Sequence, residues 1–260
     1  MTQFTLPSAS PKQTLVQDFG LGKISITYSR PSLRGRTVLG YNSLLAPLDN
    51  MWRTGADACT LITFSDDVAI QNTAIEAGTY SLFSIPGAAS WELILNKGNK
   101  GIGAYNKEDD ILRFSVPVTN IDVSTETFTI NVQQISYESC TIQLNWANVL
   151  VNFTINTSIV ERLKSSYEAQ LASENKPHFY AAYFYHLLGN DNAKALKNVD
   201  IALESNPGAY YMHYLKSMVE AAIGNKEAAI ESANKTLSTA IAANSNDYKR
   251  LAENMLLKLA

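Results

Sequence analysis

Cysteine is scarce in this sequence of 260 residues, which contains only Cys59 and Cys140. Both fall in segments that we predict to be strands, and two cysteines in a chain of this length do not make the disulfide framework of a small secreted domain. Unpaired cysteine is commonly buried as a small hydrophobic residue. We therefore expect two buried free thiols, with a bridge between them as the alternative.

Histidine is almost as scarce, and His178, His186 and His213 all lie in the C-terminal part. The N-terminal part therefore lacks the commonest general base and metal ligand, which excludes most hydrolase and zinc schemes there. His178 and His186 could share a helical face, but no acidic or cysteine ligand recurs at metal spacing. Phosphate-binding glycine loops and the usual hydrolase motifs are also absent. We predict no metal, no cofactor and no catalytic residue.

Strong net charge and long apolar runs are missing too. A formal net charge of −3 offers no electrostatic footprint for nucleic acid or for an anionic membrane, so we expect neither as a partner. No apolar run approaches the roughly 20 residues that cross a bilayer, which predicts no membrane span. The first residues, Met1 to Pro7, lack the basic and apolar regions of a secretion signal. The sequence alone thus predicts a cytoplasmic protein, although a chain trimmed of its leader would look the same.

The composition changes near residue 156. Up to Ile155 the chain is rich in Thr, Val and Ile and holds six of the eight prolines, whereas Ala, Leu, Lys, Glu and Asn dominate beyond Thr157. Such a shift marks a change of fold class. We predict an α+β protein in two segregated domains: an antiparallel β-sandwich or jelly-roll-like domain over residues 1–156, and an all-α helical-hairpin domain over residues 157–260.

In the first part, β-branched and aromatic runs alternate with turn signals about every ten residues, as in antiparallel sandwiches and barrels. The predicted strands cover residues 14–19, 23–28, 58–64, 68–72, 78–85, 91–95, 111–118, 127–135, 140–146 and 149–155. In two of them, alternation places apolar side chains on one face, which we expect to be buried. These side chains are Phe128, Ile130, Val132, Ile142, Leu144 and Trp146. The absence of intervening helices excludes a parallel sheet.

Four of the seven arginines lie in two short blocks, residues 29–36 and 52–56. The segment that joins these blocks is longer than ordinary loops, which makes it functional or disordered. Its apolar residues favour a loop packed against the mouth of the sandwich. Because guanidinium groups carry fixed charge and fork-like donors, we place the candidate ligand-binding site here. Its residues are Arg30, Arg34, Arg36, Trp52, Arg53, Asp57 and Tyr80.

Three interpretations of these side chains remain open. The arginines can tie the long loop to buried carbonyls or pair with Asp49 or Asp57 as a purely structural network. Alternatively, Trp52 and Tyr80 can stack on the ring of a small ligand while Arg30 and Arg53 bind its carboxylate or phosphate. The third interpretation is a carbohydrate-active hydrolase that uses a carboxylate pair including Asp57.

Several motifs of the first part run in the order found in one bacterial family. They are Ser29-Arg30-Pro31 followed by Gly35-Arg36, then Trp52-Arg53-Thr54-Gly55-Ala56, and Ala77-Gly78-Thr79-Tyr80-Ser81-Leu82. On these residues the chain resembles domain of unknown function 2911 over its first 155 residues. The resemblance implies a β-sandwich-like domain that occurs often in exported proteins, and hence a periplasmic or extracellular location. It brings no catalytic residues.

Beyond Thr157, Ala- and Leu-rich segments separated by helix stops and N-cap residues predict five or six antiparallel helices. Two helix pairs resemble tetratricopeptide repeats, because Ala195 and Ala229 are 34 residues apart and Gly189 and Gly224 precede them. The Trp-x-x-Leu-Gly signature of such repeats is missing, and Thr236 replaces an expected Ala.

Tyrosines recur in this part at near-helical spacing, and two interpretations are open. They form either an interhelical core or a concave peptide-binding face. The tyrosines are Tyr180, Tyr183, Tyr185, Tyr210, Tyr211 and Tyr214. Taken together, the sequence predicts a non-enzymatic binding or assembly protein with a small anionic or carbohydrate-like ligand in the β domain and a protein partner for the helical domain.

Overall fold

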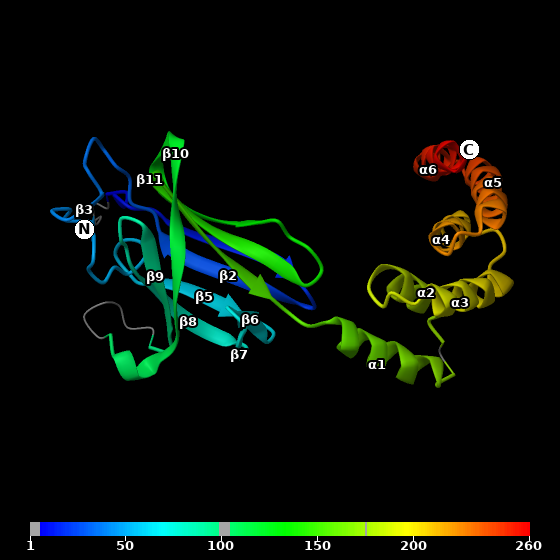
Figure 1. The fold of residues 1–260 in the computed structure, drawn as a ribbon, viewed down its shortest axis with the longest axis horizontal. Coiled ribbons are helices and arrows are strands. Elements are labelled where there is room, and N and C mark those ends of the chain that lie inside the picture. Colours follow the sequence, from blue (N-terminus) through cyan, green and yellow to red (C-terminus); the bar gives the residue numbers. More distant parts are fainter. Residues whose placement is uncertain (1–5, 99–104, 175) are drawn as a thin grey trace, which may run out of the picture. The chain divides into compact units, whose positions relative to one another are not determined.

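The computed structural model describes residues 6–98, 105–174 and 176–260, and it divides the chain into two compact units, Met1–Ile159 and Val160–Ala260 (Figure 1). Strands dominate the first unit, which also holds a short 3₁₀ helix (Lys107–Asp109), and helices dominate the second, so the predicted α+β class with segregated domains is confirmed.

Nine strands of the described residues form one antiparallel sheet. In spatial order they are β1 (Lys12–Phe19), β2 (Gly22–Ser29), β5 (Thr60–Phe64), β8 (Gly78–Ile85), β9 (Ser90–Asn96), β10 (Asp110–Gln133), β11 (Ser139–Asn156), β6 (Val68–Ile70) and β7 (Thr73–Ile75). Two short parallel strands, β3 (Leu39–Gly40) and β4 (Ala46–Pro47), lie in the long loop between β2 and β5.

Strand β10 belongs to both halves of the sheet. Its first residues pair with β9 and its later residues, from Val118 on, pair with β11 (Figure 1). The other edge of this later part pairs with the chain that follows β2, through the bridge between Ser32 and Thr127. The Phe128 amide donates to the carbonyl of Pro31 at 2.9 Å, and the Leu33 amide donates to that of Glu126 at 2.8 Å. These contacts fold the strands over one core.

The main core lies inside this fold and is built by alternation. Phe128, Ile130, Ile142, Leu144 and Trp146 are all buried, as their spacing predicts, and Val132 packs against them. A smaller cluster of Cys59, Phe83 and Ile94 packs on the opposite face of the sheet. Cys59 and Cys140 are both buried and free, as predicted, and burial raises the pKa of each thiol to about 11.

Three strand boundaries differ from the prediction, each because of local backbone geometry. The predicted strands 111–118 and 127–135 are parts of one strand, since register shifts after Asn120 and Thr125 bend β10 without ending it. The predicted strands 140–146 and 149–155 are likewise one strand, β11, with Ala147 at a φ of 50°. The predicted strand 68–72 is instead a hairpin of β6 and β7, because Gln71 and Asn72 take positive φ values that suit a tight turn.

The long loop after β2 is packed rather than open. Val38 and Ala46 are buried in the main core, and Leu39 and Leu45 pack against it, as expected. Leu44, in contrast, is almost fully exposed. The loop is therefore held by some of its apolar side chains, while others face solvent.

The helical unit contains six helices among the described residues. They are α1 (Val160–Leu171), α2 (His178–Leu187), α3 (Asn192–Ser205), α4 (Tyr210–Ala222), α5 (Lys226–Ala242) and α6 (Asn246–Leu259). Asp191 and Asn225 cap α3 and α5 by accepting amide hydrogen bonds. Ala195 and Ala229 are completely buried, so neighbouring helices approach closely there. No helix in the described part of the chain is long and apolar enough to span a membrane.

Candidate functional site

All four clustered arginines donate hydrogen bonds to the protein itself. Arg30 donates from Nε to the carbonyl of Phe128 at 3.0 Å and from Nη2 to the hydroxyl of Thr129 at 2.7 Å. Arg34 donates to the carbonyl of Ala9 at 2.9 Å. These bonds join the loop after β2 to strand β10 and to the N-terminal segment, which matches the structural interpretation of both side chains.

Arg36 is bonded within its own loop. Its Nε donates to the carbonyl of Leu33 at 3.0 Å and its Nη2 donates to that of Ser32 at 2.8 Å. Tyr80 lies elsewhere, on β8, where its ring packs on Phe64 and its hydroxyl donates to the carbonyl of Glu76 at 2.8 Å. Neither Arg36 nor Tyr80 lines the cavity that is described below.

Trp52 is part of the main core. Its ring stacks on Trp146, with centroids 5.6 Å apart, and meets the edges of Trp91 and Phe128. Its indole N–H donates to the carbonyl of Gly55 at 2.9 Å. Trp52 is only 4 % exposed, so the open stacking surface that the sequence suggested for it is largely covered by other rings.

The turn that follows Trp52 is strained. Thr54 has a φ of 53° and Asp57 a φ of 56°, and the left-handed region is unfavourable for a β-branched residue such as Thr54. Hydrogen bonds hold the turn in place. The Thr54 carbonyl accepts from the Thr60 hydroxyl at 2.6 Å, and the Thr54 hydroxyl lies 2.9 Å from that of Ser84. Strain of this kind persists where the surrounding structure imposes it, and it is found often at binding sites.

A cavity of about 250 Å³ opens beside this turn, and we call it the Trp52 cavity. It is lined by the loop after β2, by the strained turn and by β11. The lining residues are Pro31, Leu44, Leu45, Trp52, Arg53, Gly55, Ala56, Asp57 and Trp146. Three of the seven candidate residues, Trp52, Arg53 and Asp57, therefore share one cavity wall.

Charged groups in the cavity are incompletely paired. Arg53 donates from Nη1 to the main-chain carbonyl of Asp57 and not to its carboxylate. Among the described residues, no hydrogen bond or ion pair engages the Asp57 carboxylate or the other nitrogens of the Arg53 guanidinium. The cavity thus holds one positive and one negative group that do not neutralise each other.

Trp146 adds an unsatisfied donor. Trp146 is only 1 % exposed. In the described part of the chain, its indole N–H is one of three buried side-chain groups without a hydrogen-bond partner; the others are the Ser81 hydroxyl and the Asn145 amide oxygen. Leaving a buried donor unsatisfied costs about 1–3 kcal/mol. Trp146 was assigned to the core by its alternation, and nothing in the sequence distinguishes it from the other core residues of β11.

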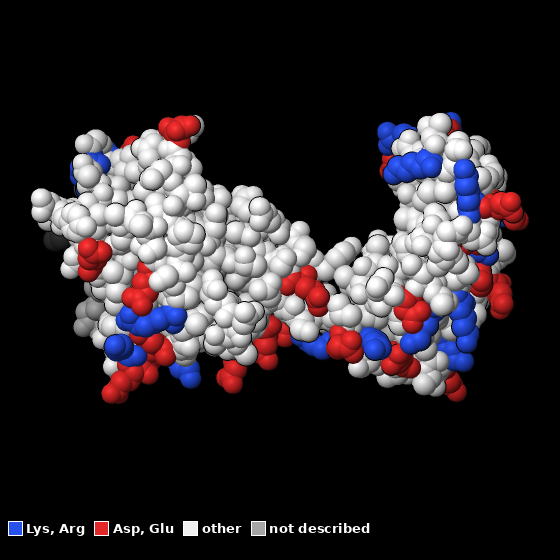
Figure 2. All heavy atoms as spheres, in the orientation of Figure 1, with Lys and Arg blue, Asp and Glu red and all other residues white. Residues whose placement is uncertain are grey.

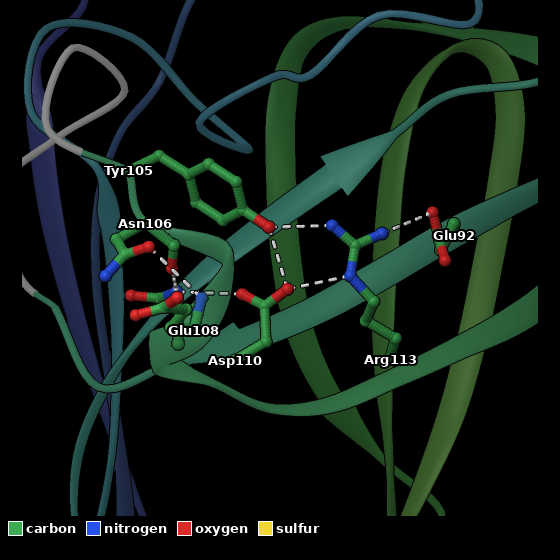
Figure 3. Close-up of polar contacts among 7 residues, drawn as sticks. Glu92, Tyr105, Asn106, Glu108, Asp110 and Arg113 are labelled. Carbon is green, nitrogen blue, oxygen red and sulfur yellow. Dashed lines mark hydrogen bonds and ion pairs between the residues drawn. The ribbon is translucent and has the colours of Figure 1, made fainter.

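A second polar cluster, which the sequence reasoning missed, lies on the other face of the sheet, and we call it the Arg113 network (Figure 3). Arg113 donates to Asp110 at 2.7 Å, to Glu92 at 2.9 Å and to the Tyr105 hydroxyl at 2.7 Å. Tyr105 in turn donates to Asp110 at 2.7 Å, and the Asn96 amide donates to the other Asp110 oxygen at 2.8 Å.

The Arg113 network fully pairs its central carboxylate. Burial raises the pKa of Asp110, but the hydrogen bonds from Asn96, Arg113 and Tyr105 together outweigh burial and hold that pKa below its usual value. Burial and the bond to Asp110 raise the pKa of Tyr105. Every charged group here has a partner within the protein, which is typical of a structural clamp on the segment before β10.

The three histidines each make one hydrogen bond. His178 and His186 bond through Nδ1 to the amide oxygens of Asn198 and Asn192, both at 2.8 Å, and His213 bonds to the carbonyl of Pro207. In residues 6–98, 105–174 and 176–260, no group of three or more His, Cys, Asp or Glu side chains could hold a metal ion.

Comparison with known proteins supports the resemblance seen in the motifs. The model of the family described as "Protein of unknown function (DUF2911)" matches residues 10–155, more than half of the chain. No curated protein and no solved structure matches the chain.

Proposed function

We propose that this chain, which belongs to the DUF2911 family, is a non-enzymatic binding protein whose β unit holds a small ligand in the Trp52 cavity. One observation carries the proposal: the cavity wall holds guanidinium nitrogens of Arg53 and an Asp57 carboxylate that no hydrogen bond or ion pair engages among the described residues. A ligand with a carboxylate or carbonyl group would satisfy these donors.

The cavity favours binding over the hydrolase alternative. Among the described residues, Asp57 is the only acidic residue of the cavity wall, whereas a glycosidase of the common type needs two carboxyl groups around the scissile bond. Arg53 contributes positive charge, but its guanidinium stays protonated and cannot act as a general base. We therefore assign Trp52, Arg53, Asp57 and Trp146 to ligand binding and assign Arg30, Arg34 and Arg36 to holding the loop.

Titration of the tryptophan fluorescence tests this proposal. All three tryptophans lie in one cluster, so a ligand in the cavity should change their emission saturably. The probes are L-valine, 3-methylbutanoate and D-glucose. We expect at least one probe to bind the wild type and the Arg36→Met control, and to lose at least tenfold in affinity with Arg53→Met. Absence of saturation with all three probes at millimolar concentration would overturn the proposal.

The helical unit suggests a second binding role, for a peptide segment of a partner protein. Seven rings of α2, α4 and α6 contact one another in series: Phe179, Tyr180, Tyr183, Tyr210, Tyr211, Tyr214 and Tyr248. Within the described residues, no hydrogen bond engages the six tyrosine hydroxyls. Figure 2 shows few charges over α4, while charged side chains gather along α3, α5 and α6. We also propose the tetratricopeptide interpretation, in which α2 and α4 are the first helices of successive hairpins.

Selection from a displayed peptide library tests this second role. Peptides that bind the wild type should lose binding to a Tyr183→Ala, Tyr211→Ala double variant and keep binding to a Tyr185→Phe control, because Tyr185 is buried away from solvent. Circular dichroism verifies that the double variant remains helical. Equal binding to the wild type and the double variant would exclude the tyrosine face as the binding surface.

The location of the protein is a further proposal. The family resemblance supports export to the periplasm or beyond. Cell fractionation with an antibody against the chain distinguishes export from cytoplasmic residence.

A further inference from the structure

We propose that the ligand of the Trp52 cavity is a zwitterion, namely a free α-amino acid with a small apolar side chain. This inference rests on the proposed binding function and adds to it the chemical class of the ligand. It follows because the Trp52 cavity combines the opposite charges of Arg53 and Asp57 with an apolar wall in a small volume.

The two charges are available to a ligand. Arg53 and Asp57 both line the cavity and sit four residues apart in one strained turn. Arg53 contacts the main chain of Asp57, so its guanidinium is anchored without using the carboxylate of that residue. A guanidinium binds a carboxylate through parallel hydrogen bonds, and a carboxylate binds an ammonium group.

The remaining wall is apolar, and the space is small. Pro31, Leu44, Leu45 and Ala56 contribute hydrophobic surface to the cavity. At about 250 Å³ the cavity lies below the range of roughly 300–1,000 Å³ that is usual for drug-sized ligands. An amino acid with a branched aliphatic side chain matches both the polarity and the size.

Two other ligand classes fit less well. A sugar is commonly held against an open aromatic face, but Trp52 and Trp146 stack on each other and are almost wholly buried. A simple anion would satisfy Arg53 and would also face the Asp57 carboxylate, which repels it at close range. Only a ligand with both charges uses both side chains favourably.

Calorimetric titration with three matched probes, and with D-glucose for comparison, tests the inference. L-Valine carries both charges, 3-methylbutanoate is the same molecule without the ammonium group, and 2-methylpropylamine is the same molecule without the carboxylate. We expect L-valine to bind at least tenfold more tightly than either of the other two. If 3-methylbutanoate binds as tightly as L-valine or more tightly, or if only D-glucose binds, the ligand is not a zwitterion. The proposed binding function would not be contradicted by either result. Absence of binding by every probe would overturn both.

A matched pair of variants sharpens this result. Asp57→Asn removes the negative charge and keeps a residue type that tolerates a positive φ, so the turn should stay folded. We expect Asp57→Asn to lower the affinity for L-valine at least tenfold. The affinity for 3-methylbutanoate should stay unchanged or increase. The control is Asp49→Asn, because Asp49 also has a positive φ, of 61°, and lies outside the cavity wall. Equal losses of L-valine binding in both variants would contradict the role of Asp57.

Discussion

The Trp52 cavity and the Arg113 network are both polar sites of the β unit, and they differ in how completely their groups are paired. Asp110, in the Arg113 network, accepts hydrogen bonds from three side chains. Asp57, in the cavity, has no partner for its carboxylate among the described residues. Fully paired groups stabilise the fold, whereas unpaired groups on a cavity wall are available to a ligand.

The largest effect should come from breaking the Arg113 network. Arg113→Met leaves the Asp110 carboxylate, 8 % exposed, without its ion pair. Removing one partner of a buried pair costs about 3–5 kcal/mol, and because Arg113 is partly exposed we expect the lower end of that range in urea denaturation. Lys23→Met is the control, since the ion pair of Lys23 with Asp18 is exposed and should be worth less than about 1 kcal/mol. A small loss in Arg113→Met would contradict the structural role of the network.

The pH dependence of stability should carry the signature of Asp110. Its pKa in the folded protein lies below the value of about 3.9 that is usual for an unfolded aspartate. The stabilisation from this shift is therefore fully present above about pH 4 and is lost as the pH falls through the folded-state pKa. We expect the free energy of unfolding to decrease in this acidic range. Asp110→Asn should flatten that part of the profile, and an unchanged profile would exclude Asp110 as its source.

Arg30 should have a smaller structural effect. It makes two hydrogen bonds that join the chain after β2 to β10, and a hydrogen bond to a charged group contributes about 1.5–3 kcal/mol when it is buried. Because Arg30 is only half-buried, we expect Arg30→Met to destabilise the protein by about 1–2 kcal/mol. Thermal unfolding measures the effect, and a loss no greater than that of Arg53→Met would contradict the assignment of Arg30 to the scaffold.

Arg53 should have the smallest effect on stability. Its guanidinium has one protein partner, the carbonyl of Asp57, so Arg53→Met should change the free energy of unfolding by less than about 1 kcal/mol. The same variant should lose ligand binding, which separates the two sites by function. A large drop in the melting temperature would return Arg53 to the structural interpretation.

Much of the fold follows from the sequence, because alternation and composition report burial directly. The buried face of β10 and β11, the free thiols and the helical second part were all predicted. The strand boundaries at residues 118–127 and 147–149 were not, because bulges bend a strand at residues that also suit a turn. Local sequence signals do not distinguish these two outcomes.

The candidate site was only partly predictable. Its arginine and tryptophan blocks drew attention to Trp52, Arg53 and Asp57, which do share a cavity. Arg30 and Tyr80 could not be separated from them by sequence, because their partners, Phe128 and Glu76, are main-chain carbonyls that any residue provides. The role of Trp146 depends on the absence of a partner in three dimensions, which no motif encodes.

The indole N–H signal of Trp146 in a nitrogen–proton correlation spectrum tests the central claim most directly. Trp146→Phe assigns the signal among those of the three tryptophans. The account predicts that this signal shifts saturably when L-valine is added to the wild type, and that it stays in place in Arg53→Met. A Trp146 signal that no probe moves, in a protein whose other signals are equally unaffected, would show that the Trp52 cavity is not a ligand site.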